Sequence, residues 1–160
     1  MSDIKKILPL YQCNINMLSK ACEYSIKAAV YLAAQSKEGK LSNVKQIAHA
    51  IDSPEAFTAK VLQLLVKSDL ISSIKGVKGG FYIEPKTLKK LNLLQIVTAI
   101  DGEGLMHNCM LGLSQCSEVN PCPVHHQYKS IKASIIKMLK SSMVGELTDD
   151  VAQKLSVLKN

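Results

Sequence analysis

The sequence contains no arginine and no tryptophan, so all 20 of its basic residues are lysines. Without arginine, the chain cannot make the bidentate arginine–guanine contact, which is the commonest specific contact in DNA recognition. It also has no apolar run long enough to cross a bilayer, and its start contains only a short apolar stretch from Ile7 to Tyr11. We therefore expect a cytoplasmic protein with no membrane partner.

The sequence contains five cysteines, an odd number. In a chain that shows no secretion signal, this argues against a disulfide framework. It favours free thiols, metal ligands or redox sensing instead. We expect Cys13 and Cys22 to be structural, because they lie apart from the other three and Cys22 is on the apolar face of a predicted helix.

The composition is that of one folded, mainly helical protein, with 47% hydrophobic and 21% charged residues in 160. Residues 17–90 hold 12 lysines and 6 acids, whereas residues 91–160 hold 6 of each. A polyanion partner for the first half explains this asymmetry, and a merely solubilising lysine-rich surface is the alternative. We divide the chain into an N-terminal extension (1–16), a DNA-binding domain (17–90), and a cysteine loop with a dimerisation helix (91–160).

The first half has the pattern of a helix-turn-helix. Apolar residues recur every three or four positions from Leu18 to Gln35, and Ser42-Asn43 can cap a second helix. Pro54 suits the first turn of a third helix. In that third helix we expect an inner and an outer face: Phe57, Val61, Leu62, Leu64 and Leu65 inside, and Glu55, Ala56, Thr58, Ala59, Lys60 and Lys67 outside.

A β-hairpin should follow this motif. Two β-prone runs, 71–75 and 81–84, enclose the glycine-rich segment 76–80, which is typical of a wing. Glycines allow the backbone to approach a phosphate or a minor groove, and lysines supply charge, although an ordinary exposed hairpin is the alternative. The predicted DNA-binding residues are Ser53, Pro54, Thr58, Ala59, Lys60, Lys75, Lys78, Gly79 and Gly80.

The second half should contain a helix near 93–100, a loop at 102–124 and a long helix at 126–143. The long helix has an apolar stripe that includes Tyr128, Ile131, Ile135 and Met138. This stripe requires a partner surface. The same helix of a second copy is one solution, and packing back on its own core is the other.

Three cysteines lie in the loop, spaced Cys109-x6-Cys116-x5-Cys122. Such a compact set of soft ligands suits an iron-sulfur cluster. Structural zinc sites usually place ligands two to four residues apart, so zinc is second, and three unrelated buried thiols are a further alternative. His125 is the local candidate for a fourth ligand.

These features together resemble the Rrf2 family of bacterial winged-helix regulators, over about residues 18–147. The similarity lies in Leu18-Ser19-Lys20-Ala21-Cys22-Glu23-Tyr24, in Ile74-Lys75-Gly76-Val77-Lys78-Gly79-Gly80-Phe81 and in the three-cysteine loop. It implies a mainly α fold with a small β-hairpin, double-stranded DNA as partner, and a homodimer joined through the long helix. It also implies DNA affinity that responds to the state of an iron-sulfur cluster.

The resemblance suggests two alternatives for the extra ligand. In IscR-like members, which bind a 2Fe-2S cluster, a histidine matches His125; in NsrR-like members an acidic residue of the partner's first helix matches Glu23. We expect 2Fe-2S rather than 4Fe-4S. The sequence departs from the family in its six-residue first cysteine gap, in Lys75 where arginine is usual, and in Ala59 where IscR has glutamate.

Two other functions fit parts of the sequence. A winged-helix regulator could depend on thiol oxidation or zinc without a cluster. A thiol enzyme would need an oriented base and a substrate pocket, and nothing beyond His125 and His126 suggests either. The sequence therefore predicts a regulator that senses iron-sulfur supply, nitric oxide or redox state, and not an enzyme.

Overall fold

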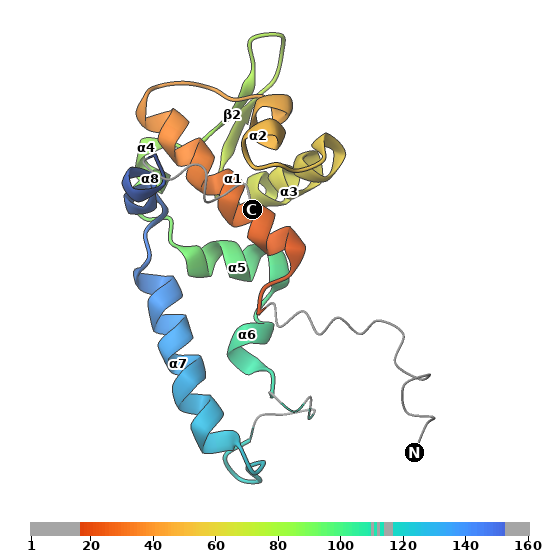
Figure 1. Ribbon diagram of the computed structural model, residues 1–160, viewed down its shortest axis with the longest axis vertical. Coiled ribbons are helices and arrows are strands. Elements are labelled where there is room, and N and C mark those ends of the chain that lie inside the picture. The colour runs from red at the N-terminus through yellow and green to blue at the C-terminus, as the bar shows by residue number, and fades with distance from the viewer. Residues whose placement is uncertain (1–16, 110, 112, 114–116, 153–160) are drawn as a thin grey trace, which may run out of the picture.

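The computed structural model describes residues 17–109, 111, 113 and 117–152 (Figure 1). In this part of the chain the fold is mainly helical, with a single two-stranded antiparallel sheet. The elements in chain order are α1 (Lys20–Lys37), α2 (Val44–Ala50), α3 (Glu55–Lys67), β1 (Ser72–Ile74), β2 (Gly80–Tyr82), α4 (Pro85–Leu88), α5 (Leu93–Asp101), α6 (Gly104–His107), α7 (His125–Ser141) and α8 (Val144–Ala152).

Short polar motifs set where several helices begin. The Ser19 hydroxyl accepts a hydrogen bond from the Cys22 amide at 3.1 Å and so caps α1. Asn43 and Gln46 form a reciprocal capping box at the start of α2, and Asn92 and Gln95 form another at α5. These caps satisfy backbone N–H groups that have no partner inside the helix, which is why the predicted starts near 44 and 93 are confirmed.

The main core surrounds α1. Helices α2, α3, α5 and α8 and strand β2 all pack on it, and Figure 1 shows α1 crossing the centre of the upper part of the molecule. The largest fully buried side chains are Leu32, Ile47, Ile51, Leu62, Leu65, Ile83, Leu91 and Ile96. Burial of these aliphatic groups from several elements makes the first half and α8 one packed unit.

The hairpin after α3 confirms the predicted wing. Ser73 pairs with Phe81, and the three-residue strands join through a turn in which the Gly79 amide donates to the Gly76 carbonyl at 2.9 Å. Ser42, just before α2, exchanges two backbone hydrogen bonds with Phe81. The base of the wing is therefore tied to the helix-turn-helix.

Helix α7 runs away from the core as a 17-residue helix, beside α5 and α6 (Figure 1). It begins at His125 and ends at Ser141, close to the predicted bounds. Helices α4, α6 and α8 were not predicted. α4 and α6 have four residues each, too few for a periodic pattern, and α8 depends on its packing against α1.

The predicted faces of α3 need correction at two residues. Thr58 was placed on the outer face, but its side chain is fully buried, and Leu64, placed inside, is 43% exposed. Val61, Leu62 and Leu65 are buried as predicted. The inner stripe is set by how α3 packs on α1, where Tyr24 meets Phe57 edge to face, and this orientation turns Thr58 inward.

Among the described helices, none combines the length and the apolar character required to cross a membrane.

Candidate DNA interface and cysteine site

The exposed face of α3 forms one part of the candidate DNA interface. Pro54 caps the helix without a side-chain hydrogen bond, and Ser53 and Ala59 are half-buried while Lys60 is exposed. Gln63 is also exposed on this helix and was not predicted as a site residue. Its spacing of three from Lys60 places both on one face, so helical periodicity could have identified it.

Thr58 does not belong to this face, because its hydroxyl is buried beneath the helix. That hydroxyl has no hydrogen-bond partner among the described residues. In this conformation, direct contact between Thr58 and DNA is excluded.

The wing forms the second part. Lys75 and Lys78 are exposed on either side of Gly76 and Val77, and Val77 at the tip is fully exposed. Gly76 has a φ of 111°, which L side chains rarely adopt. A Cβ on Gly79 would lie 2.1 Å from the Ile74 carbonyl oxygen, so this position has no room for a side chain. The tight turn therefore depends on glycine and presents two lysines to solvent.

The cysteine site brings Cys109 and Cys122 together. Cys109 is 8% exposed, Cys122 is partly buried, and both are free thiols. Hydrogen bonds from the backbone amides of Leu111 and Leu113 and from the Cys122 thiol, together with the nearby charge of Lys132, lower the pKa of Cys109. The arrangement favours a thiolate, which is the form that binds metals and reacts with oxidants.

Lys132 contributes this charge from α7. It is only 8% exposed; its Nζ lies 3.5 Å from the Asn108 carbonyl oxygen and 5.2 Å from the centre of the Tyr128 ring. Lys132 was not predicted as a site residue, since a lysine on a lysine-rich helix is usually exposed.

His125 is buried at the first position of α7, and its backbone N–H donates to the Cys122 carbonyl at 2.9 Å. The ring of His126 lies edge to face with it, with centroids 5.3 Å apart. The structure thus places Cys109, Cys122 and the His125 backbone near one another. Cys116 lies outside the described residues, and the described ranges contain no group of three or more His, Cys, Asp or Glu positioned to hold a metal ion.

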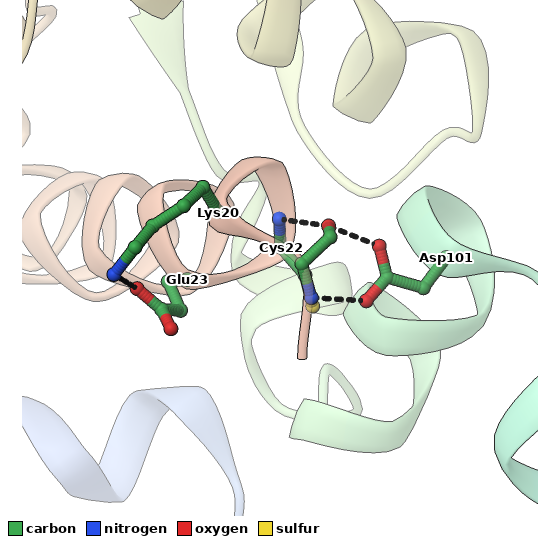
Figure 2. Close-up of polar contacts among 5 residues, drawn as sticks. Lys20, Cys22, Glu23 and Asp101 are labelled. Carbon is green, nitrogen blue, oxygen red and sulfur yellow. Dashed lines mark hydrogen bonds and ion pairs between the residues drawn. The ribbon is translucent and has the colours of Figure 1, made fainter. Parts of the chain in front are cut away.

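Glu23, the alternative ligand, lies on α1. Its carboxylate pairs with Lys20 at 2.6 Å, as Figure 2 shows, and its side chain is 30% exposed. In a single chain, then, Glu23 is engaged by a neighbour on its own helix.

Cys22 differs from the loop cysteines. It is fully buried, and burial, with the carboxylates of Asp101 and Glu23, raises the pKa of its thiol to about 12. Such a thiol is unreactive near neutral pH. The structural role predicted for Cys22 agrees with its place in a small apolar cluster with Val97 and Leu139.

Comparison with known proteins gave one family. The family model described as "Rrf2: Iron-dependent Transcriptional regulator" matches residues 18–150. An HTH-type transcriptional regulator of Aquifex aeolicus is 31% identical over 133 residues, covering 82% of this chain and 90% of the relative. The HTH-type transcriptional regulator NsrR of Halalkalibacterium halodurans is 28% identical over 145 residues, covering 89% and 98%.

Solved structures share the fold. CymR (YrzC), the global cysteine regulator of B. subtilis, superposes with a TM-score of 0.66 at 19% identity, covering 82% of this chain and 95% of that one. IscR of T. potens superposes with a TM-score of 0.64 at 20% identity, covering 84% and 87%. At these identities the similarity establishes the fold alone.

Proposed function

This chain belongs to the Rrf2 family of DNA-binding transcriptional regulators, and from that premise we propose that it is a homodimer whose DNA affinity depends on an iron-sulfur cluster held by Cys109, Cys116 and Cys122. The observation that supports this most directly is the pairing of Cys109 with Cys122, in which the pKa of Cys109 is lowered. Two adjacent soft donors, one of them predisposed to ionise, fit iron. The positive charge of Lys132 would also favour an anionic group between them.

The fourth ligand is proposed to be His125, with a 2Fe-2S cluster. It lies three residues after Cys122, is buried, and donates its backbone N–H to the Cys122 carbonyl. Glu23 of a second subunit is the alternative, for which the pair with Lys20 would have to open. When bound, the cluster would supply a labile iron-sulfide group that reacts with nitric oxide or oxidants, or is lost when iron is scarce.

The test is anaerobic purification followed by a visible absorption spectrum and assays for iron and sulfide. We expect wild type to be coloured and Cys116→Ala to be colourless, while Cys22→Ala, outside the loop, keeps the colour. A colourless, iron-free wild type would reject the cluster. Comparing His125→Ala and Glu23→Gln with His126→Ala then identifies the fourth ligand by its effect on the spectrum.

The proposed DNA contacts are Ser53, Pro54, Ala59 and Lys60 on the recognition helix and Lys75, Lys78, Gly79 and Gly80 in the wing. The exposure of the three lysines supports this set. Each phosphate contact that is lost lowers the slope of log affinity against log salt by about one. We expect Lys75→Gln combined with Lys78→Gln to lower that slope by about two on a generic duplex, whereas Lys137→Gln on α7 leaves it unchanged.

The proposed dimer forms through α7. Ile131 and Met138 on this helix are 56% and 55% exposed in the single chain, seven residues apart and so on one face. We expect sedimentation to show a dimer for wild type and a monomer for Ile131→Glu. Lys137→Glu serves as the control for an added acid on the same helix, and a dimer that survives Ile131→Glu would place the interface elsewhere.

A second candidate function is favoured by the same thiol pair. In the absence of a cluster, Cys109 and Cys122 could form a disulfide, with two electrons and two protons passing to an oxidant such as peroxide, which becomes water. Peptide mapping of cluster-free protein treated with peroxide should then show Cys109 linked to Cys122. Linkage without any iron in freshly purified protein would favour this thiol switch over the cluster.

A further inference from the structure

A carboxylate at the start of the cysteine loop is hydrogen-bonded to Ser19, the residue that caps α1. Asp101 is the last residue of α5, and Cys109 follows eight positions later. One oxygen of Asp101 accepts from the Ser19 backbone N–H at 2.9 Å, and the other accepts from the Ser19 hydroxyl. Figure 2 shows Asp101 beside the start of α1, on the side of Cys22, with Glu23 and Lys20 farther away. The contact joins residues 82 positions apart.

Electrostatics explains why an acid is placed there. The C-terminus of a helix bears partial negative charge, so Asp101 is unfavourable for α5 itself. The N-terminus of α1 bears partial positive charge and unsatisfied N–H groups, which favour an anion. The hydrogen bonds of Asp101 to Ser19 therefore explain why an acid lies at this position, since an acid there does not stabilise α5.

The other end of this segment is attached to the cysteine site. The Asn108 carbonyl oxygen lies 3.5 Å from Lys132 Nζ, and the Cys109 thiol is hydrogen-bonded to that of Cys122. Between the two ends, α6 packs on α7. Residues 101–109 therefore connect α1 at one end with the cysteine pair at the other.

Helix α1 leads directly to the DNA-binding elements, because α2, α3 and β2 pack on it. We propose that Asp101 is the positioning residue through which the state of the cysteine loop reaches α1 and, through α1, the recognition helix and the wing. This coupling rests on the proposed function in one respect: the cysteine loop must change its chemical state. Either a cluster or a disulfide would provide that change.

Apolar packing gives a second connection that has to be separated from this one. Cys22, Val97 and Leu139 join α1, α5 and α7 in a small buried cluster. That cluster holds the helices together whatever the loop does. Asp101 is exposed and contributes polar contacts rather than apolar packing, so replacing it should remove the coupling while leaving the buried cluster intact.

The test is a double-mutant cycle on full-length, reduced, cluster-free protein. The four proteins are wild type, Asp101→Asn, Cys109→Ser and the double variant. The readout is hydrogen exchange at the amides of Cys22 and Glu23, which donate to the Ser19 hydroxyl and the Ser19 carbonyl respectively. Circular dichroism and thermal unfolding check that each variant is folded.

We expect Cys109→Ser to change these exchange rates about threefold or more in the wild-type background and less than about twofold in the Asp101→Asn background. Asp101→Glu, which keeps the carboxylate, should restore the response. Glu103→Gln, an exposed acid two residues along that pairs with His107, should not alter it. If Asp101 were merely structural, Asp101→Asn would raise the exchange rates by the same factor whether residue 109 is cysteine or serine.

Equal responses in both backgrounds, or no response to Cys109→Ser in the wild-type background, would overturn the coupling. The proteins in the cycle contain no cluster. If the protein fails to bind iron and sulfide, the proposed cluster is therefore rejected, but the coupling measured by hydrogen exchange is unaffected. Additive exchange in a protein that does bind a cluster would reject the coupling alone.

Discussion

Leu62 in the recognition helix and Cys109 in the cysteine loop are both buried, but by different kinds of neighbours. Leu62 is fully buried in a cluster of aliphatic side chains that includes Leu32 and Ile47. The neighbours that act on Cys109 are polar or ionisable: backbone amides, the Cys122 thiol and the charged end of Lys132. The packing of aliphatic side chains does not change with the redox state or the metal supply, whereas the contacts of cysteine thiols depend on both.

This difference suggests a division of labour. The DNA-binding unit keeps its shape because many aliphatic groups from several helices share the burial. The cysteine site depends on a few polar contacts, each of which changes when a thiol ionises, is oxidised or binds iron. A regulator needs both a stable DNA-binding unit and a segment that responds to a signal. Substitutions in each of the two regions test this difference.

The largest effect should come from the packed side. Leu62→Ala leaves a cavity in the core and should lower the free energy of unfolding by about 2–5 kcal/mol. Leu64→Ala, two residues along the same helix but 43% exposed, is the matched control and should change it by less than about 1 kcal/mol. Chemical denaturation measures both, and similar losses would mean that α3 is packed differently.

The wing should be the next most sensitive. Gly79→Ala places a Cβ 2.1 Å from the Ile74 carbonyl oxygen, so the backbone of the turn has to move. We expect a loss of about 1–3 kcal/mol in stability or in affinity for duplex DNA. Val77→Ala, at the exposed tip, is the control for stability and should leave unfolding unchanged.

Cys22 should make stability depend on alkaline pH. The fold raises the pKa of its thiol from the ordinary value of 9.0 to about 12. Between these values the unfolded chain has lost the proton that the folded chain retains, so stability falls as pH rises from about 9. The melting temperature of wild type should therefore fall more steeply above about pH 9 than that of Cys22→Ala. Parallel curves of melting temperature against pH would contradict the burial of this thiol.

The smallest effect should come from Thr58. Its buried hydroxyl has no hydrogen-bond partner among the described residues, so Thr58→Val removes an unsatisfied polar group and should be neutral or stabilising by up to about 1 kcal/mol. Thr148 is the contrasting case, since its hydroxyl donates to the Gly145 carbonyl and accepts from Lys37. Thr148→Val should destabilise the protein, and the opposite order of the two variants would show that Thr58 has a partner.

Much of the fold could be predicted from local patterns. Ser19 and Asn43 mark helix starts through hydrogen bonds that reach only three residues, and the glycines of the wing mark a turn. The face of α3 was harder to predict. Thr58 and Leu64 both border the apolar stripe, and their order of burial is decided by the contact of α3 with α1.

The candidate site was predictable in its residue types but not in its contacts. The spacing of the three cysteines indicated a soft-metal site, yet no pattern indicated that Lys132 on α7 would lie beside Cys109. Nor did any pattern suggest that Asp101 would accept two hydrogen bonds from Ser19. Contacts of this kind depend on how distant segments pack.

Local sequence patterns were sufficient to predict the helix-turn-helix, the wing, the long helix that corresponds to α7 and the excess of positive charge on the first half, and they indicated three cysteines as candidate ligands. These properties follow from periodicity, capping and composition, which act over a few residues. Only the packing of distant segments buries Thr58, brings Cys109 to Cys122 and joins Asp101, at the start of the cysteine loop, to Ser19 at the start of α1. Those outcomes arise because apolar burial and hydrogen bonding bring together residues as far as 82 positions apart.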